Sequence, residues 1–150
     1  MQREIKTQVD IHASAQRVWE ILTEFQNYPA WNPFVTKIAG PLQAGANVRF
    51  WFTLPFGGSL PARATILNSM PEVELRWAGA LPIPGLLRAE HYHVIEVLGI
   101  NRVRFHQGEI FTGLLVAPFW PLFAARGVHL YEQSSLALKK RAEAHQSIQG

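Results

Sequence analysis

The stretch RAEHYHVIEVLGINRVRFHQGEIFT, residues 88–112, alternates in polarity on both sides of a short Gly-Ile-Asn segment. This pattern predicts a β-hairpin with a loop at residues 99–101 and with Leu98 opposite Arg102. Four cross-strand pairs then share one face, namely Val97 with Val103, Ile95 with Phe105, His93 with Gln107, and His91 with Glu109. The face is apolar near the turn and polar at its far end. Such a gradient indicates a lined cavity rather than a filled interior.

The composition predicts a single globular domain spanning residues 1–150. Hydrophobic residues make up 48% of the chain and charged residues 17%, which excludes a disordered chain. The formal net charge of +3 is modest, and the basic residues are scattered apart from Lys139, Lys140 and Arg141. Nucleic acid is therefore not an expected partner. The absence of cysteine excludes disulfides, thiolate metal sites and a cysteine nucleophile.

The chain carries no recognisable targeting or membrane-spanning segment. Residues 1–10 are charged and alternating, unlike a signal peptide. Pro118 and Pro121 interrupt the most apolar run, residues 114–125, which is also too short to span a bilayer. We therefore expect a soluble cytoplasmic protein.

Alternation predicts five strands besides the hairpin, at residues 4–12, 34–39, 48–54, 60–69 and 72–79. In the last of these, Val73, Leu75 and Trp77 are expected on one face. Ser14 is the expected N-cap of a helix after the first strand, and residues 27–33 predict a short helix or turn.

The C-terminal part changes to a period of three and four residues. This spacing predicts one long amphipathic helix from about Trp120 to His145, with Pro118 and Pro121 in its first turn. The whole order predicts an α+β fold in which a curved, seven-stranded antiparallel sheet wraps around the C-terminal helix. Two short helices follow the first strand, and a cavity lies between sheet and long helix.

Five strings resemble the START-like, or Bet v 1-like (SRPBCC), superfamily. They are IHASAQRVW at 11–19, YPAWNP at 28–33, LRW at 75–77, EHYH at 90–93 and FHQGEIFTG at 105–113. The nearest groups are the bacterial polyketide cyclase/dehydrase and lipid-transport families. The resemblance implies a helix-grip fold over the whole chain, a ligand cavity, and no metal or cofactor. Because members include carriers, receptors, cyclases and interaction modules, it does not fix a reaction.

His91 and Glu109 form the sharpest candidate pair. Directly opposed on an inward face, they are expected to share a charge-assisted hydrogen bond that raises the pKa of His91 and lowers that of Glu109. They are then candidates for acid–base catalysis, or for orienting a ligand, unless they only satisfy one another. A metal held by His91, His93 and Glu109 lacks a fourth ligand, so no metal is expected.

Ligand contact is expected for a set of aromatic, polar and small residues that face the cavity. This set comprises Trp31, Phe50, Phe52, Trp77, His91, His93, Gln107, Glu109, Phe111, Phe123 and Gly127. Gly127 lies on the inner face of the long helix, where it gives either clearance for a ligand or close packing on the sheet.

Three loops are unusually apolar, at residues 54–60, 80–87 and 113–121. Their expected uses are a lid over the cavity, a rim in transient contact with a membrane, a homodimer contact, or packing on one another. The leading functional hypothesis is binding of a small hydrophobic molecule such as a lipid, a quinone or a polyketide-like aromatic. One alternative is a polyketide cyclase/dehydrase-type enzyme that uses Glu109 and His91. Another is a protein-interaction module.

Overall fold

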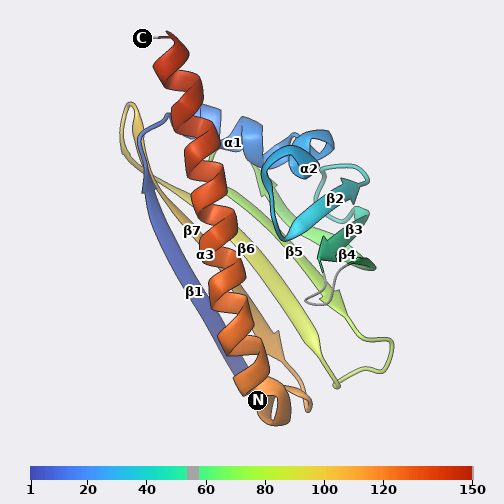
Figure 1. The fold of residues 1–150 in the computed structure, drawn as a ribbon. Coiled ribbons are helices and arrows are strands. Elements are labelled where there is room, and N and C mark those ends of the chain that lie inside the picture. The colour runs from blue at the N-terminus through green and yellow to red at the C-terminus, as the bar shows by residue number, and fades with distance from the viewer. Residues whose placement is uncertain (54–57, 150) are drawn as a thin grey trace.

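A computed structural model of the protein describes residues 1–53 and 58–149. Seven strands and four helical segments follow one another along the chain (Figure 1). In order they are β1 (Gln2–Ile11), α1 (Ala15–Thr23), the 3-10 turn η1 (Phe25–Asn27), α2 (Tyr28–Trp31), β2 (Val35–Ala39), β3 (Asn47–Thr53), β4 (Ser59–Met70), β5 (Glu74–Ala80), β6 (Arg88–Gly99), β7 (Arg102–Thr112) and α3 (Val116–Gln149).

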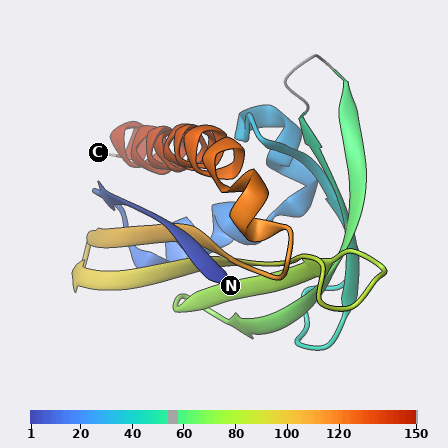
Figure 2. The same ribbon diagram turned by 90° about the horizontal axis from the view of Figure 1, so that it is seen from below.

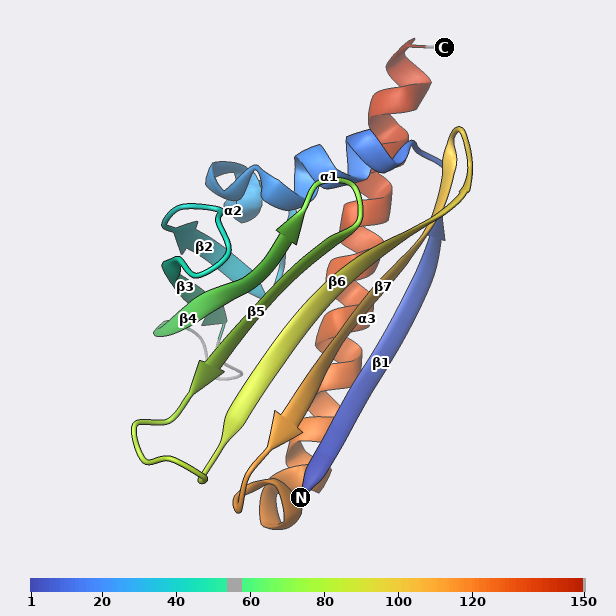
Figure 3. The same ribbon diagram turned by 180° about the vertical axis from the view of Figure 1, so that it is seen from behind.

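The strands form one antiparallel sheet in the order β1-β7-β6-β5-β4-β3-β2. Figure 2 shows the sheet turning a corner, with β1, β7, β6 and β5 beneath α3, and β4, β3 and β2 rising beside it. Seen from behind, α3 lies across the concave side of the strands (Figure 3). The predicted helix-grip fold is therefore confirmed.

The β6–β7 hairpin has the predicted register from Val97–Val103 down to His91–Glu109. The expected pairing of Leu98 with Arg102 is wrong, because Gly99 pairs with Arg102 and the ladder shifts between Val97 and Gly99. Only Ile100 and Asn101 form the turn. A bulge at Leu98 allows so tight a turn while keeping the twist of the two strands.

Two other expectations at element ends are corrected. Helix α3 begins at Val116 rather than near Trp120, so Pro118 is in its first turn while Pro121 lies inside the helix. Val73 is exposed in the turn before β5 and does not share the inner face of Leu75 and Trp77. The predicted loop at 54–60 falls partly outside the described residues, because 54–57 are not among them.

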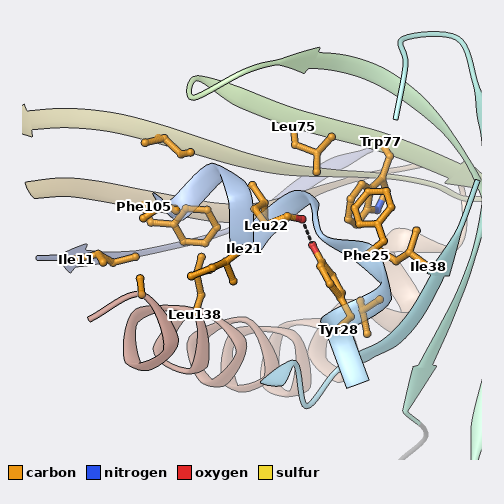
Figure 4. Packing of buried hydrophobic residues seen from close by; sticks show 14 of the residues in the cluster. Ile11, Ile21, Leu22, Phe25, Tyr28, Ile38, Leu75, Trp77, Phe105 and Leu138 are labelled. Carbon is orange, nitrogen blue, oxygen red and sulfur yellow. Dashed lines mark hydrogen bonds between the residues drawn. The ribbon is translucent and has the colours of Figure 1, made fainter. Parts of the chain in front are cut away.

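The main core fills the end of the sheet beneath α1. Ser14 caps α1 as predicted, its hydroxyl accepting the Arg17 N–H at 3.1 Å. Val18, Ile21 and Leu22 turn inward from this helix. Figure 4 shows Leu138 of α3 pointing toward Ile21, and the Tyr28 hydroxyl donating to the Leu22 carbonyl at 2.5 Å. A smaller cluster of Ile5, Phe111, Val116 and Tyr131 lies apart from this core.

Candidate functional site

A pocket of about 610 Å³ lies between the concave face of the sheet and α3. Its walls are mainly aromatic and aliphatic, which is typical of sites for small hydrophobic molecules. Eight predicted site residues line it, namely Phe50, Phe52, Trp77, His91, Glu109, Phe111, Phe123 and Gly127. The structure brings these eight together, and their contact with a ligand stays a prediction.

Alternation along the strands builds the aromatic wall. Successive inward positions of β3 carry Phe50 and Phe52, whose ring centres are 5.9 Å apart. Phe50 meets Trp77 of β5 at 6.3 Å, and Trp77 meets His91 of β6 at 5.3 Å. The wall therefore runs without interruption from β3 to the polar groups of β6 and β7.

Gln107 organises the polar groups behind the pocket. Its side-chain oxygen accepts hydrogen bonds from Ser135 at 2.7 Å and from Ser134 at 3.2 Å, both on α3. Its amide nitrogen lies 3.0 Å from Nε2 of His91. Because this amide nitrogen can only donate, Nε2 accepts, and the imidazole proton is on Nδ1.

The contact between the Gln107 amide and Nε2 opposes a second proton on His91. Protonation at Nε2 would place two donors against each other, and the imidazole is buried in any case. Burial lowers the pKa of His91 to about 3. The neutral ring directs its Nδ1–H toward Glu109, whose Oε2 lies 3.7 Å away.

The pKa of Glu109 is shifted in the direction opposite to that of a carboxylate in an ion pair. Its side chain is 15% exposed at the pocket wall, and burial raises its pKa to about 8. Both directions reverse the expected ones for His91 and Glu109. Their separation is too long for a charge-assisted hydrogen bond, so desolvation decides both pKa values.

Three predicted ligand residues lie outside the pocket lining. His93 donates from Nδ1 to the Leu75 carbonyl at 3.1 Å, and its ring stacks on that of His91 with centres 4.5 Å apart. Gln107 lies behind His91 and contacts α3, as described above. Trp31 packs on Tyr28, with ring centres 4.9 Å apart.

Sequence reasoning missed several lining residues, of which Tyr131 is the most buried. Its ring meets the edge of His91 at 5.0 Å. Tyr131 follows Gly127 by four residues, so the helical period places both on the inner face of α3 and could have found it. Arg63 of β4 and Arg126 of α3 also line the pocket, and no sequence pattern marked either one.

Gly127 packs closely on the sheet, which is one of its two expected uses, while clearance for a ligand stays a prediction. It lines the pocket, and a Cβ added at this position would lie 2.5 Å from Cδ1 of Ile5 on β1. The glycine thus allows close approach of α3 to β1 beside the pocket.

A family model described as polyketide cyclase / dehydrase and lipid transport matches residues 2–143. The chain belongs to this family. A sequence search found no match among proteins with curated descriptions. The match to the family model confirms the predicted family, and solved structures share the predicted helix-grip fold.

Three of these structures illustrate how widely the fold is shared. The Zhui aromatase/cyclase from a Streptomyces species is 16% identical, with a TM-score of 0.74 over 95% of this chain and 94% of that one. A START superfamily protein from Mycobacterium smegmatis is 18% identical, with a TM-score of 0.70 and coverages of 94% and 97%. Norcoclaurine synthase from Thalictrum flavum, in complex with dopamine and hydroxybenzaldehyde, is 11% identical, with a TM-score of 0.71 and coverages of 97% and 88%. At these identities the likeness concerns the fold alone.

Among the side chains that the structure describes, those of residues 1–53 and 58–144, no three His, Cys, Asp or Glu are grouped so that they could hold a metal ion. No helix of the described chain is both long and apolar enough to cross a membrane.

The shifted pKa values predict how stability depends on pH in this family member. Folded Glu109, with a pKa of about 8, keeps a proton that the unfolded chain releases above its ordinary pKa of 4.5, so its contribution falls as pH rises from 4.5 to 8. The lowered pKa values of His91 and His93 act oppositely, and their contribution is lost as pH falls below 6.5. Between pH 6.5 and 8, the contribution of Glu109 to stability changes, whereas those of His91 and His93 stay nearly constant. We expect the free energy of unfolding to fall by up to about 2 kcal/mol across this interval.

Urea unfolding at pH 6.5 and pH 8 measures this slope of the free energy of unfolding against pH. Glu109→Gln should remove it, whereas the exposed Glu132→Gln on α3 should leave it unchanged. A slope that survives in Glu109→Gln would show that another group titrates.

Proposed function

We propose that this protein binds one small hydrophobic molecule in the pocket between the sheet and α3. The observation that carries the proposal is an apolar pocket of about 610 Å³ whose inner polar groups, His91 and Glu109, are both uncharged at neutral pH. This volume lies within the range of about 300–1,000 Å³ typical of small-molecule sites. The family description and the aromatic ligands of norcoclaurine synthase support the same class of function.

The polar groups select the kind of ligand. The Nδ1–H of His91 and the protonated carboxyl of Glu109 both offer a hydrogen-bond donor at the wall. Neither of these two groups offers a positive charge to an anion, whereas a carbonyl or hydroxyl oxygen beside them is well matched. The proposed ligands are therefore lipids, quinones or polyketide-like aromatics that place a neutral oxygen at this point.

A titration with the neutral fluorescent probe N-phenylnaphthylamine tests the proposal. We expect saturable binding at one site per chain, with displacement by quinones and hydroxylated aromatics. Displacement should be weaker for analogues that lack the oxygen, because His91 and Glu109 then lose their partner. Fluorescence that rises without saturation, or that no competitor reduces, would contradict the proposal.

A second candidate function is acid–base catalysis on a ligand held in this pocket. It is favoured by the 3.7 Å separation of a neutral imidazole and a protonated carboxyl. In an enolisation, the carboxyl of Glu109 would protonate a carbonyl oxygen beside the Nδ1–H of His91, and the resulting carboxylate would take the proton from the neighbouring carbon, so that an enol forms and the carboxyl is regenerated. Glu109→Gln should then lower turnover by about 10²–10⁴-fold while probe binding stays normal. Unchanged turnover in this variant would exclude the enzyme role.

A further inference from the structure

One end of the molecule presents a continuous apolar surface, which we call the apolar end. It comprises the β5–β6 loop, residues 81–87, and the start of α3 with its connection, residues 113–122. Large side chains stand exposed on both segments, including Ile83 at 62% and Leu114 at 75%. Phe119 and Leu122 are also about half exposed.

Backbone hydrogen bonds join the two segments. Leu114 donates to the Gly85 carbonyl and Leu115 to the Leu86 carbonyl, each at 3.0 Å. Figures 1 and 3 show both segments at the same end of the molecule, beside the N-terminus of β1. The exposed side chains therefore form one surface rather than separate single residues, and an exposed apolar surface of this kind marks an interaction site.

Within the two segments and their flanks, the charges are one-sided. Residues 81–88 and 110–131 contain Arg88, Arg126 and His129 but neither Asp nor Glu. Arg3 of β1 adds a guanidinium 5.9 Å above the ring of Trp120. Two carboxylates lie just outside these ranges. That of Glu4 accepts a hydrogen bond from Tyr92, and that of Glu90 lies 3.4 Å from the guanidinium of Arg88, so Arg3 and Arg126 carry the basic character of the rim. An apolar surface with a basic rim and an indole beside it matches an anionic lipid surface in both polarity and charge.

The pocket reaches this end of the molecule. Leu81 and Leu87 of the loop and Leu122 of α3 line the pocket, and Leu81 and Leu122 are exposed as well. Arg126 lines the pocket too. A surface seated on the apolar end would therefore lie against residues that line the pocket.

We propose that the apolar end docks on the surface of an anionic lipid bilayer. The bilayer receives Ile83, Leu114 and Phe119, while the basic rim contacts the lipid headgroups. Passage of a hydrophobic ligand between bilayer and pocket would follow, and that step alone rests on the proposed function. Docking itself does not require a ligand.

Co-sedimentation with vesicles tests the docking. The wild-type protein should bind vesicles that contain phosphatidylglycerol and phosphatidylcholine, and should bind less to phosphatidylcholine alone or in high salt. The double variant Ile83→Glu, Leu114→Glu should bind at least roughly tenfold more weakly, because it places carboxylates in the contact. Arg3→Gln should reduce binding by roughly fivefold.

The matched control is Ile100→Glu. Ile100 is 91% exposed in the β6–β7 turn, at the opposite end of the molecule. With Val97→Glu added at the same end, where Val97 is 62% exposed, the control also introduces two carboxylates and should bind vesicles like the wild type. Equal binding by the double variant, or no binding by the wild type at low salt, would overturn the proposal.

Probe binding separates this proposal from the proposed function. Ile83 and Leu114 do not line the pocket, so the double variant should bind N-phenylnaphthylamine normally. Lost vesicle binding with normal probe binding in that variant supports docking, whereas a wild-type protein that binds vesicles but no probe overturns only the proposed function. A dimer that forms in solution and is lost in the double variant would assign the surface to a second copy of the chain instead.

Discussion

Ala89→Trp should abolish ligand binding while preserving the fold. Ala89 lies on β6 between His91 and the apolar end, and its side chain lines the pocket. An indole at this position would fill the space that the ligand is proposed to occupy. We expect affinity for N-phenylnaphthylamine to fall by at least about 100-fold, since a filled pocket leaves little apolar surface to bury.

The fold should survive because the indole enters space that is already present. Overfilling a packed core costs about 1–3 kcal/mol, and a partly empty pocket should cost less. Val94→Trp is the matched control, because Val94 lies on the same strand but faces the opposite side of the sheet, beside His106. It should bind the probe normally. Normal probe binding by Ala89→Trp would place the ligand elsewhere.

Leu138→Ala should destabilise the protein by about 2–5 kcal/mol, the usual cost of truncating a fully buried leucine. Leu138 is 1% exposed and joins α3 to the main core beneath α1. Urea unfolding measures the change. Leu136→Ala, two residues away on the exposed side of α3, removes the same atoms from a surface position. Its effect should be within about 0.5 kcal/mol of zero.

Similar losses of stability in Leu138→Ala and Leu136→Ala would contradict the placement of α3. If the sheet did not enclose this helix, position 138 would be no more sensitive than position 136. The contrast between the two variants therefore tests the helix-grip arrangement in solution.

Strand pairing was predictable because alternation and a short turn leave few registers open. A one-residue slip in β6–β7 would have exposed Ile95 and Phe105, so the sequence pattern favoured one register strongly. The bulge at Leu98 was not predictable, since it depends on how the strands twist into the turn. The start of α3 was placed too late because Pro118 and Pro121 hid the first turn of the helix.

It was harder to predict which residues line the pocket than which face of a strand points inward. His93 and Gln107 share an inward face with His91 and Glu109, yet only the latter pair reaches the pocket. The difference comes from α3, whose Ser134 and Ser135 cover Gln107. Periodicity tells which side of a strand faces inward, but it does not tell where along the strand a helix stops covering it.

The predicted directions of the pKa shifts of His91 and Glu109 were wrong for a related reason. Cross-strand opposition correctly placed the imidazole of His91 near the carboxyl of Glu109, but it could not show that Gln107 already occupies Nε2. Burial then favours the neutral form of both groups. The electrostatics of such a pair depend on third residues that come from distant parts of the chain.

Native mass spectrometry of gently purified protein, followed by organic extraction, is the most direct test of a ligand-filled pocket. The wild-type chain and Val94→Trp should each carry one non-covalently bound hydrophobic molecule, or take up one equivalent of N-phenylnaphthylamine when purified empty. Ala89→Trp should carry none under either condition. A wild-type chain that stays bare both as purified and after incubation with the probe would contradict the account.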